Sequence, residues 1–184
     1  MPQSRILSRD NAVLLIVDVQ EAFRKYLPDM AGLAKSIGTL VQGCQLIGVP
    51  ILVTEQYPKG LGKTVPEIAE SLAGVTAIEK SCFSCCQSPQ FMDELRKLNR
   101  NQIIVCGIEA HVCVNQTVHD LLSEGFQTHI VLDAIASRSN VNKEAGVTKM
   151  LSSGAIASTV EMSLFEMLYE SGTDVFKAVQ KLLK

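Results

Sequence analysis

Cys113 stands where the pattern of a buried strand changes into the pattern of a helix. The apolar run at 103–106 precedes it, and the segment 107–117 leads into helix-spaced positions that include Val118 and Leu121. At the start of a helix, free N–H groups and the helix dipole favour a thiolate. We therefore predict that Cys113 is a nucleophile with a lowered pKa.

Two other ionisable residues also follow strand patterns. Asp18 comes directly after the apolar run 12–17, and Lys80 comes directly after the run 76–79. In open parallel sheets with right-handed crossovers, the carboxyl ends of the strands share one edge, and ligands bind there. We expect Asp18, Lys80 and Cys113 to meet at this edge.

These three residues together would support acyl transfer. Cys113 would attack a carbonyl carbon, Asp18 would take the thiol proton and return it to a leaving amine, and Lys80 would lower the thiol pKa. Backbone N–H groups at 109–113 would stabilise the oxyanion. Taken singly, Asp18 would cap a turn, Lys80 would be solvated and Cys113 would belong to the core, so the prediction depends on their convergence.

The elements that position these residues alternate along the chain. Strand patterns cover 12–17, 51–54, 76–79, 102–107, 128–132 and 155–159. Helix patterns cover 30–48, 65–73, 90–98, 112–124, 142–152 and 173–183. Alternation of apolar strands with helices predicts an open parallel α/β sheet. We expect one domain over residues 1–184, with no repeat or linker.

Composition narrows the class of protein. The chain has 184 residues and a formal net charge of −2, which gives no electrostatic reason to expect nucleic acid. Its six cysteines fall in helix, strand and loop patterns alike, which favours reduced thiols. No secretory segment is evident, and the apolar run 12–17 is too short to cross a bilayer. We therefore expect an intracellular, cytoplasmic protein that acts on a small molecule without a membrane.

No cofactor or metal is predicted. The Gly62-Lys63-Thr64 sequence lacks the upstream glycine of a phosphate-binding loop, because Tyr57 stands there. No Gly-x-Gly-x-x-Gly follows the first strand. The cysteines at 82, 85 and 86 have no second ligand pair at zinc spacing.

Candidate substrate contacts lie near the predicted strand ends or beside Cys113. They are Gln20, Phe23, Tyr57, Phe83, His111 and Arg138. Phe23 fits the core equally well, and Arg138 fits either an anchor for an anionic substrate group or an ion pair. The amphipathic segment 162–168 fits core packing or, alternatively, a subunit interface.

Three separated segments resemble the isochorismatase-like cysteine hydrolases. They are Val-Asp-Val-Gln at 17–20, Glu-Lys-Ser at 79–81 and Cys-Gly-Ile-Glu-Ala-His-Val-Cys-Val at 106–114. Segments 54–58, 60–62, 82–84 and 137–139 are similar to the subgroup of isochorismatase domain-containing proteins. The resemblance spans essentially the whole chain, with the motifs in the same order.

The resemblance implies a fold and a site. It implies a doubly wound, six-stranded sheet with helices on both faces, a triad of Asp18, Lys80 and Cys113, and a homo-oligomer. It also implies a cis peptide between Ile108 and Glu109, with the N–H groups of Glu109 and Cys113 facing the substrate carbonyl.

Two departures bear on the substrate. Family members that hydrolyse nicotinamide carry a histidine-containing metal site after the second strand, where this chain has Thr-Glu-Gln-Tyr at 54–57. Members that cleave the vinyl ether of isochorismate typically lack the cysteine. We therefore expect a small amide or related C–N carbonyl substrate. A vinyl ether hydrolase that does not use the thiol, and a non-catalytic interaction protein on the same scaffold, remain alternatives.

Overall fold

A parallel sheet forms the centre of the computed structural model, which describes residues 4–72 and 74–184. Its six strands follow the order β3-β2-β1-β4-β5-β6. Their bounds are β1 Ala12–Val17, β2 Ile51–Gln56, β3 Ile78–Lys80, β4 Gln102–Ile108, β5 Gln127–Ala136 and β6 Ile156–Ser158. The order reverses direction between β1 and β4, which defines a doubly wound sheet.

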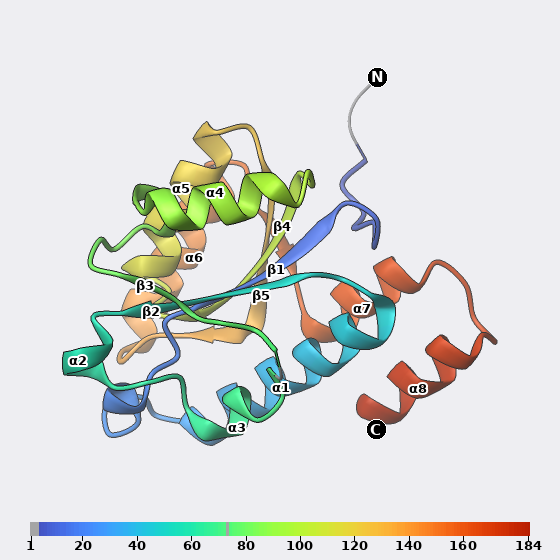
Figure 1. The fold of residues 1–184 in the computed structure, drawn as a ribbon, viewed down its shortest axis with the longest axis horizontal. Coiled ribbons are helices and arrows are strands. Elements are labelled where there is room, and N and C mark those ends of the chain that lie inside the picture. Colours follow the sequence, from blue (N-terminus) through green and yellow to red (C-terminus); the bar gives the residue numbers. More distant parts are fainter. Residues whose placement is uncertain (1–3, 73) are drawn as a thin grey trace.

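Helices cover both faces of the sheet (Figure 1). One face carries α1 Met30–Ile47, α3 Pro66–Ala69, α7 Val160–Leu168 and α8 Asp174–Leu182. The other face carries α4 Pro89–Lys97, α5 Cys113–Ser123 and α6 Asn140–Ser152. The short α2 Pro58–Leu61 and the 3-10 turns η1 Glu21–Phe23 and η2 Cys85–Gln87 lie in connections. The predicted fold class, an open α/β sheet covered on both sides, is confirmed.

The alternation of side chains along β1 explains the two cores. Leu14 and Ile16 pack into the cluster that includes α1 and α7, whereas Val13 and Leu15 pack into the cluster that includes α4 and α5. Successive residues of a strand point to opposite faces, so a strand buried on both sides must be apolar throughout. This requirement accounts for the unbroken apolar run at 12–17.

Most predicted elements occur, with three corrections. β5 continues to Ala136 instead of ending at 132, because a register shift against β4 between Val105 and Gly107 lets pairing resume beyond Asp133. No helix was predicted at 160–168, where α7 occurs; the side chain of Thr159 caps its start by accepting the N–H of Met162. The second predicted helix, 65–73, is shorter in the structure, where α3 covers Pro66–Ala69; its predicted end at residue 73 lies outside the described residues.

Smaller differences concern the loops. β3 covers Ile78–Lys80 rather than 76–79, and α2 and η2 lie in segments predicted to be irregular. The amphipathic segment 162–168 belongs to α7, whose buried side, including Leu164 and Met167, joins the α1 core. Core packing is thus confirmed for that side of α7.

Gly107 lets β1 and β4 approach closely at the edge where the sheet reverses direction. It has a φ of +115°, and a Cβ there would lie 2.1 Å from the carbonyl oxygen of Val17. Only glycine avoids that contact. The residues that follow β1 and β4 are therefore held side by side.

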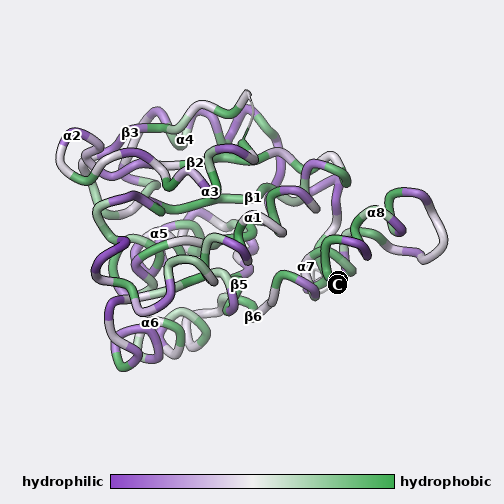
Figure 2. The backbone as a smooth tube through the Cα atoms, turned by 90° about the horizontal axis from the view of Figure 1, so that it is seen from below, coloured by the Kyte–Doolittle hydropathy of each residue, from purple (hydrophilic) through white to green (hydrophobic). Residues whose placement is uncertain are grey.

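Figure 2 shows apolar segments in the interior and α8 at one end of the molecule, far from α2. The carboxyl ends of the strands face the α2 end (Figure 1). Within the described ranges, no helix is both long enough and apolar enough to cross a membrane.

Candidate active site

Asp18 and Lys80 form a buried ion pair at the carboxyl edge of the sheet. The Lys80 Nζ donates to Asp18 Oδ2 at 2.6 Å, and the two side chains are 0% and 2% exposed. Asp18 has a φ of 53° directly after β1, a conformation that aspartate tolerates better than most residues. The predicted convergence of these strand-end residues therefore appears in the structure.

Lys80 has further acceptors that hold it in place. Its Nζ also donates to Gln56 Oε1 at 2.9 Å and to the carbonyl oxygens of Cys82 and Phe83 at 3.1 Å each. Burial lowers the pKa of Lys80, but the negative charges that Cys85, Asp18 and Cys113 can carry outweigh it and raise the pKa above its usual value. The amine is therefore a fixed cation and not a base.

Thr54 forms a hydrogen bond with the second carboxylate oxygen of Asp18. Its hydroxyl donates to Asp18 Oδ1 at 2.7 Å and lies 3.6 Å from the Cys85 Sγ. Cys85 is fully buried, and its N–H donates to Thr117 Oγ1 at 2.9 Å. Sequence reasoning assigned no role to Thr54, Gln56 or Cys85, although Thr54 and Gln56 lie on β2, the strand next to β1.

Cys113 is the first residue of α5 and is 7% exposed. Burial raises the pKa of its thiol, and the Asp18 carboxylate raises it further, while Lys80 acts in the opposite direction. The predicted lowering of this pKa is therefore wrong. A buried thiol beside a carboxylate stays protonated until a base takes the proton, and Asp18 is adjacent.

The turn before Cys113 presents two backbone donors. The peptide between Ile108 and Glu109 is cis. The carbonyl of Glu109 accepts the N–H groups of Val112 and Val114 at 3.0 and 3.2 Å. Within the described residues, the N–H groups of Glu109 and Cys113 have no hydrogen-bond acceptor. Such free N–H groups beside a nucleophile are what an oxyanion hole requires.

α6 packs tightly against this turn. A Cβ on Gly146 would lie 2.8 Å from the carbonyl oxygen of Ala110, so the absence of a side chain lets α6 touch the turn. The buried Glu109 carboxylate accepts the backbone N–H of Arg138 at 3.1 Å and its Nε at 2.9 Å. Arg138 thus forms an ion pair, one of its two predicted uses.

The other predicted substrate contacts differ from one another in burial and in hydrogen bonding. Gln20 is fully buried and bonds backbone groups of Gln56 and Gly62, so its amide is occupied in joining loops. Phe23 packs against the core. Tyr57 and Phe83 are 60% and 54% exposed. His111 shares a hydrogen bond of 3.1 Å between its Nδ1 and Ser137 Oγ.

The described residues contain no cluster of three or more histidine, cysteine, aspartate or glutamate side chains arranged to hold a metal ion. Near the end of β2, close to where the family resemblance would place a histidine-containing metal site, the chain has Glu55. Its buried carboxylate accepts from the N–H and hydroxyl of Thr64 and from Lys63 Nζ. Glu55 is therefore already paired with the segment that follows α2.

The comparisons with known proteins agree with this architecture. The Isochorismatase domain family matches residues 12–162. Isochorismatase domain-containing protein 2 of Danio rerio is 36% identical over 178 residues, which cover 96% of this chain and 89% of that protein. The chain belongs to the isochorismatase family, as its motifs predicted, and this membership indicates a hydrolase.

Solved structures share the fold. A structure described as MAR1 ribonuclease from Caenorhabditis elegans has a TM-score of 0.91 and 37% identity, covering 97% of this chain and 92% of that chain. The YcaC gene product of Escherichia coli, described as an octameric hydrolase of unknown specificity, has a TM-score of 0.90 but 18% identity, covering 99% of this chain and 92% of that chain. The second likeness concerns the fold alone.

Proposed function

We propose that this chain, acting as a single domain, is a cofactor-independent cysteine hydrolase. Its substrate is a small amide or a related C–N carbonyl compound. The observation that carries the proposal is the buried Asp18–Lys80 pair beside a nearly buried thiol at a helix start. The membership in the isochorismatase family supports hydrolysis.

In the first half of the reaction, Asp18 takes the proton of Cys113 as the sulfur attacks the carbonyl carbon. The N–H groups of Glu109 and Cys113 stabilise the oxyanion, and Lys80 holds Asp18 and offsets its charge. The C–N bond then breaks, and the protonated Asp18 gives its proton to the leaving amine. A thioester on Cys113 remains.

Water completes the cycle. Asp18 takes a proton from the attacking water, the C–S bond breaks, and the thiolate regains the proton. The net change is one amide and one water converted to a carboxylic acid and an amine. No redox partner is needed.

Arg138 and three pocket residues would select the substrate. The Nε of Arg138 is used by Glu109, which leaves the terminal nitrogens to bind a carboxylate on the substrate. Phe83, Tyr57 and His111 would form the walls. The exposed rings of Phe83 and Tyr57 suit this role, whereas Gln20 and Phe23 would shape the site from behind.

Two statements concern the whole protein. We propose a homo-oligomer, and the fold shared with a protein described as octameric supports it. We also propose a cytoplasmic location. All six cysteines are free, which suits a reducing compartment.

Intact-mass trapping tests the mechanism. Wild-type protein is incubated with a library of amides, ureas and imides and quenched in acid. We expect an acyl adduct on Cys113 and release of an amine, and both are lost in Cys113→Ala. Cys86→Ala is the control, because Cys86 is a half-buried thiol outside the triad, and it should retain both.

Other outcomes would favour the alternatives. Turnover of a vinyl ether by Cys113→Ala at the wild-type rate would contradict the thioester path. Cleavage of RNA in a parallel assay, prompted by the ribonuclease name of a relative, would contradict the amide substrate. Inactivity across the library, together with a stable protein partner, would favour an interaction protein.

A further inference from the structure

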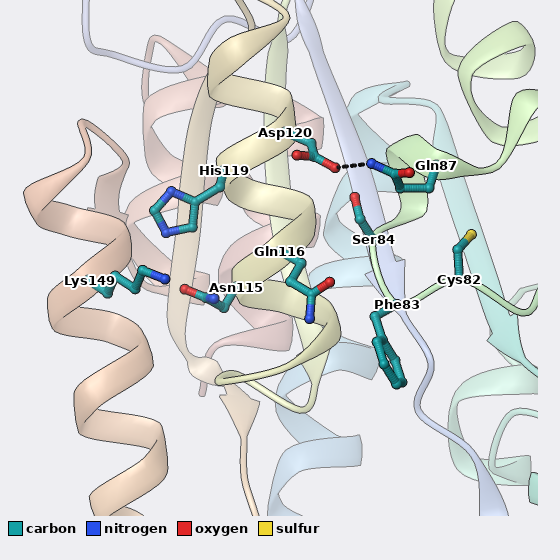
Figure 3. A pocket seen from close by; sticks show the side chains of 9 residues that line it. All are labelled: Cys82, Phe83, Ser84, Gln87, Asn115, Gln116, His119, Asp120 and Lys149. Carbon is teal, nitrogen blue, oxygen red and sulfur yellow. Dashed lines mark hydrogen bonds between the residues drawn. The ribbon is translucent and has the colours of Figure 1, made fainter.

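A polar cavity of about 500 Å³ lies along α5, beside the candidate active site. It is bounded by α5, by α6 and by the segment that contains η2 (Figure 3). Its lining residues are Cys82, Phe83, Ser84, Gln87, Asn115, Gln116, His119, Asp120 and Lys149. Asp18, Lys80 and Cys113 are not among them, so the cavity is distinct from the proposed catalytic centre.

Two buried polar atoms in this cavity lack partners. Within the described residues, Asn115 Oδ1 and His119 Nε2 have no hydrogen bond, and Asn115 is 8% exposed. In Figure 3, Lys149 extends from α6 toward both of these side chains. An unpaired buried polar atom costs about 1–3 kcal/mol, so a ligand or water that supplied the missing hydrogen bonds would stabilise this region.

One pair of side chains in the cavity is already hydrogen-bonded. Gln87 Nε2 donates to Asp120 Oδ2 at 3.3 Å, which closes the far side (Figure 3). The two buried atoms that lack a partner among the described residues lie where α5 faces α6. This region offers an acceptor at Asn115, a cationic donor at Lys149, and a nitrogen at His119 that either donates or accepts according to its tautomer.

We propose that this cavity is a subsite for an uncharged carboxamide or ureido group. The N–H of such a group donates to Asn115 Oδ1, and its carbonyl oxygen accepts from Lys149 Nζ. A carboxylate would satisfy Lys149, but it would pair with Asn115 only if the side-chain amide turned to present its Nδ2 donors. An ammonium group would satisfy Asn115 but would be repelled by Lys149.

The subsite stands apart from the proposed reaction but adjoins it. Cys82 and Phe83 line the cavity, and their carbonyl oxygens hold the Lys80 amine. A bound amide would thus contact the segment that fixes Lys80. Binding in this cavity does not require Cys113 to be a nucleophile, so the two proposals fail separately.

Binding is measured on Cys113→Ala protein, which cannot form a thioester. Acetamide, N-methylurea, acetate and methylammonium are titrated at equal ionic strength, and the side-chain amide resonance of Asn115 is followed by NMR. We expect saturable shifts with acetamide and N-methylurea, and none with the two ions. Shifts with acetate alone would overturn the proposal in favour of an anion site.

Variants assign the binding to these residues. Losing one hydrogen bond weakens binding by about three- to tenfold, so Lys149→Met and Asn115→Leu should each weaken acetamide binding by about that factor. For both variants, backbone resonances of α5 and α6 report binding. Lys181→Met on α8 removes another exposed lysine and should leave the affinity unchanged.

Thermal unfolding shows whether each variant is folded. If Asn115→Leu does not fold, Lys149→Met decides, since Lys149 lies at the surface. The proposal would be overturned if Lys149→Met bound acetamide with the same affinity as the parent Cys113→Ala protein. So would the absence of saturable binding of acetamide and N-methylurea.

Discussion

The thiol of Cys113 lies between influences that move its pKa in opposite directions. Burial and the Asp18 carboxylate raise it, and Lys80 lowers it. A thiol kept protonated in the free protein is protected from oxidation, because the thiolate is the reactive form. In the proposed mechanism, Asp18 removes the proton only when a carbonyl carbon is in place.

Removing the charge of Asp18 and removing the charge of Lys80 should shift the pH dependence of Cys113 alkylation in opposite directions. We expect Asp18→Asn to lower the pKa of Cys113, because a raising charge is lost, and Lys80→Met to raise it. The measurement is the pH dependence of iodoacetamide modification of Cys113, read by peptide mass spectrometry. The half-buried Cys86 in the same protein is the internal reference.

Folding must be checked in both variants. Removing one partner of a buried ion pair costs about 3–5 kcal/mol, because the other charge is left uncompensated. Asp18→Asn with Lys80→Met removes both charges and should regain part of this stability. Shifts of the same sign in the two single variants would contradict the assigned electrostatics.

At the scale of elements, the site depends on how closely β1 and β4 approach. Asp18 follows β1, and the turn that leads to Cys113 follows β4. The two strands are paired from Ala12 with Gln102 to Val17 with Gly107. The reversal of strand order between them opens the crevice in which ligands of such sheets bind.

Gly107→Ala should therefore be much more damaging than an alanine at another positive-φ glycine. The new Cβ would lie 2.1 Å from the Val17 oxygen, whereas at Gly48, with a φ of +83°, it would meet nothing within 4 Å. We expect Gly48→Ala to cost about 1–2 kcal/mol from the left-handed conformation alone. Gly107→Ala should cost more, because strain from the contact is added.

Denaturant unfolding of the two variants checks this expectation. Activity or Cys113 alkylation of any folded Gly107→Ala protein should also be altered, because β1 and β4 would have to separate. Equal losses of stability at the two positions would show that the close approach of the strands is not the reason for glycine at 107.

At the scale of the whole molecule, one buried histidine links stability to pH. His129 on β5 is 1% exposed, and burial lowers its pKa to about 4 from about 6.5. Because the folded protein resists protonation, the unfolded chain binds more protons below pH 6.5. The stabilising contribution is full above about pH 6.5 and is lost as pH falls toward 4.

Between pH 7.5 and 5, this linkage should lower the free energy of unfolding by about 2 kcal/mol. Urea unfolding at the two pH values measures it. His129→Gln should lose this part of the pH dependence while retaining the part due to carboxylates. An unchanged pH dependence in the variant would contradict the assignment to His129.

The outer side of α7 is where we expect subunits to meet. Met162 and Phe165 are 49% and 39% exposed, while the opposite side of α7 belongs to the core. A charge should weaken an apolar contact, so Met162→Glu should lower the mass measured by light scattering. Leu46→Glu on α1, also an exposed apolar position, is the control. A monomeric wild-type protein would contradict the expectation.

The sequence by itself determined the class of fold, the motifs of the family and the strand ends that carry Asp18, Lys80 and Cys113. All three follow from local information, because the spacing of apolar residues, the residues that end helices and the ends of strands can be read along the chain. α7 was missed for the same reason. Its amphipathic residues were recognised, but their packing against α1 depends on segments far apart in the sequence.

Only the tertiary structure decided the surroundings of these residues. It gave Asp18 and Lys80 their partners Thr54 and Gln56, and it reversed the expected direction of the Cys113 pKa. It also revealed buried atoms of Asn115 and His119 that have no hydrogen-bond partner among residues 4–72 and 74–184. Burial and pairing arise from distances between segments, and no pattern along one segment specifies those distances.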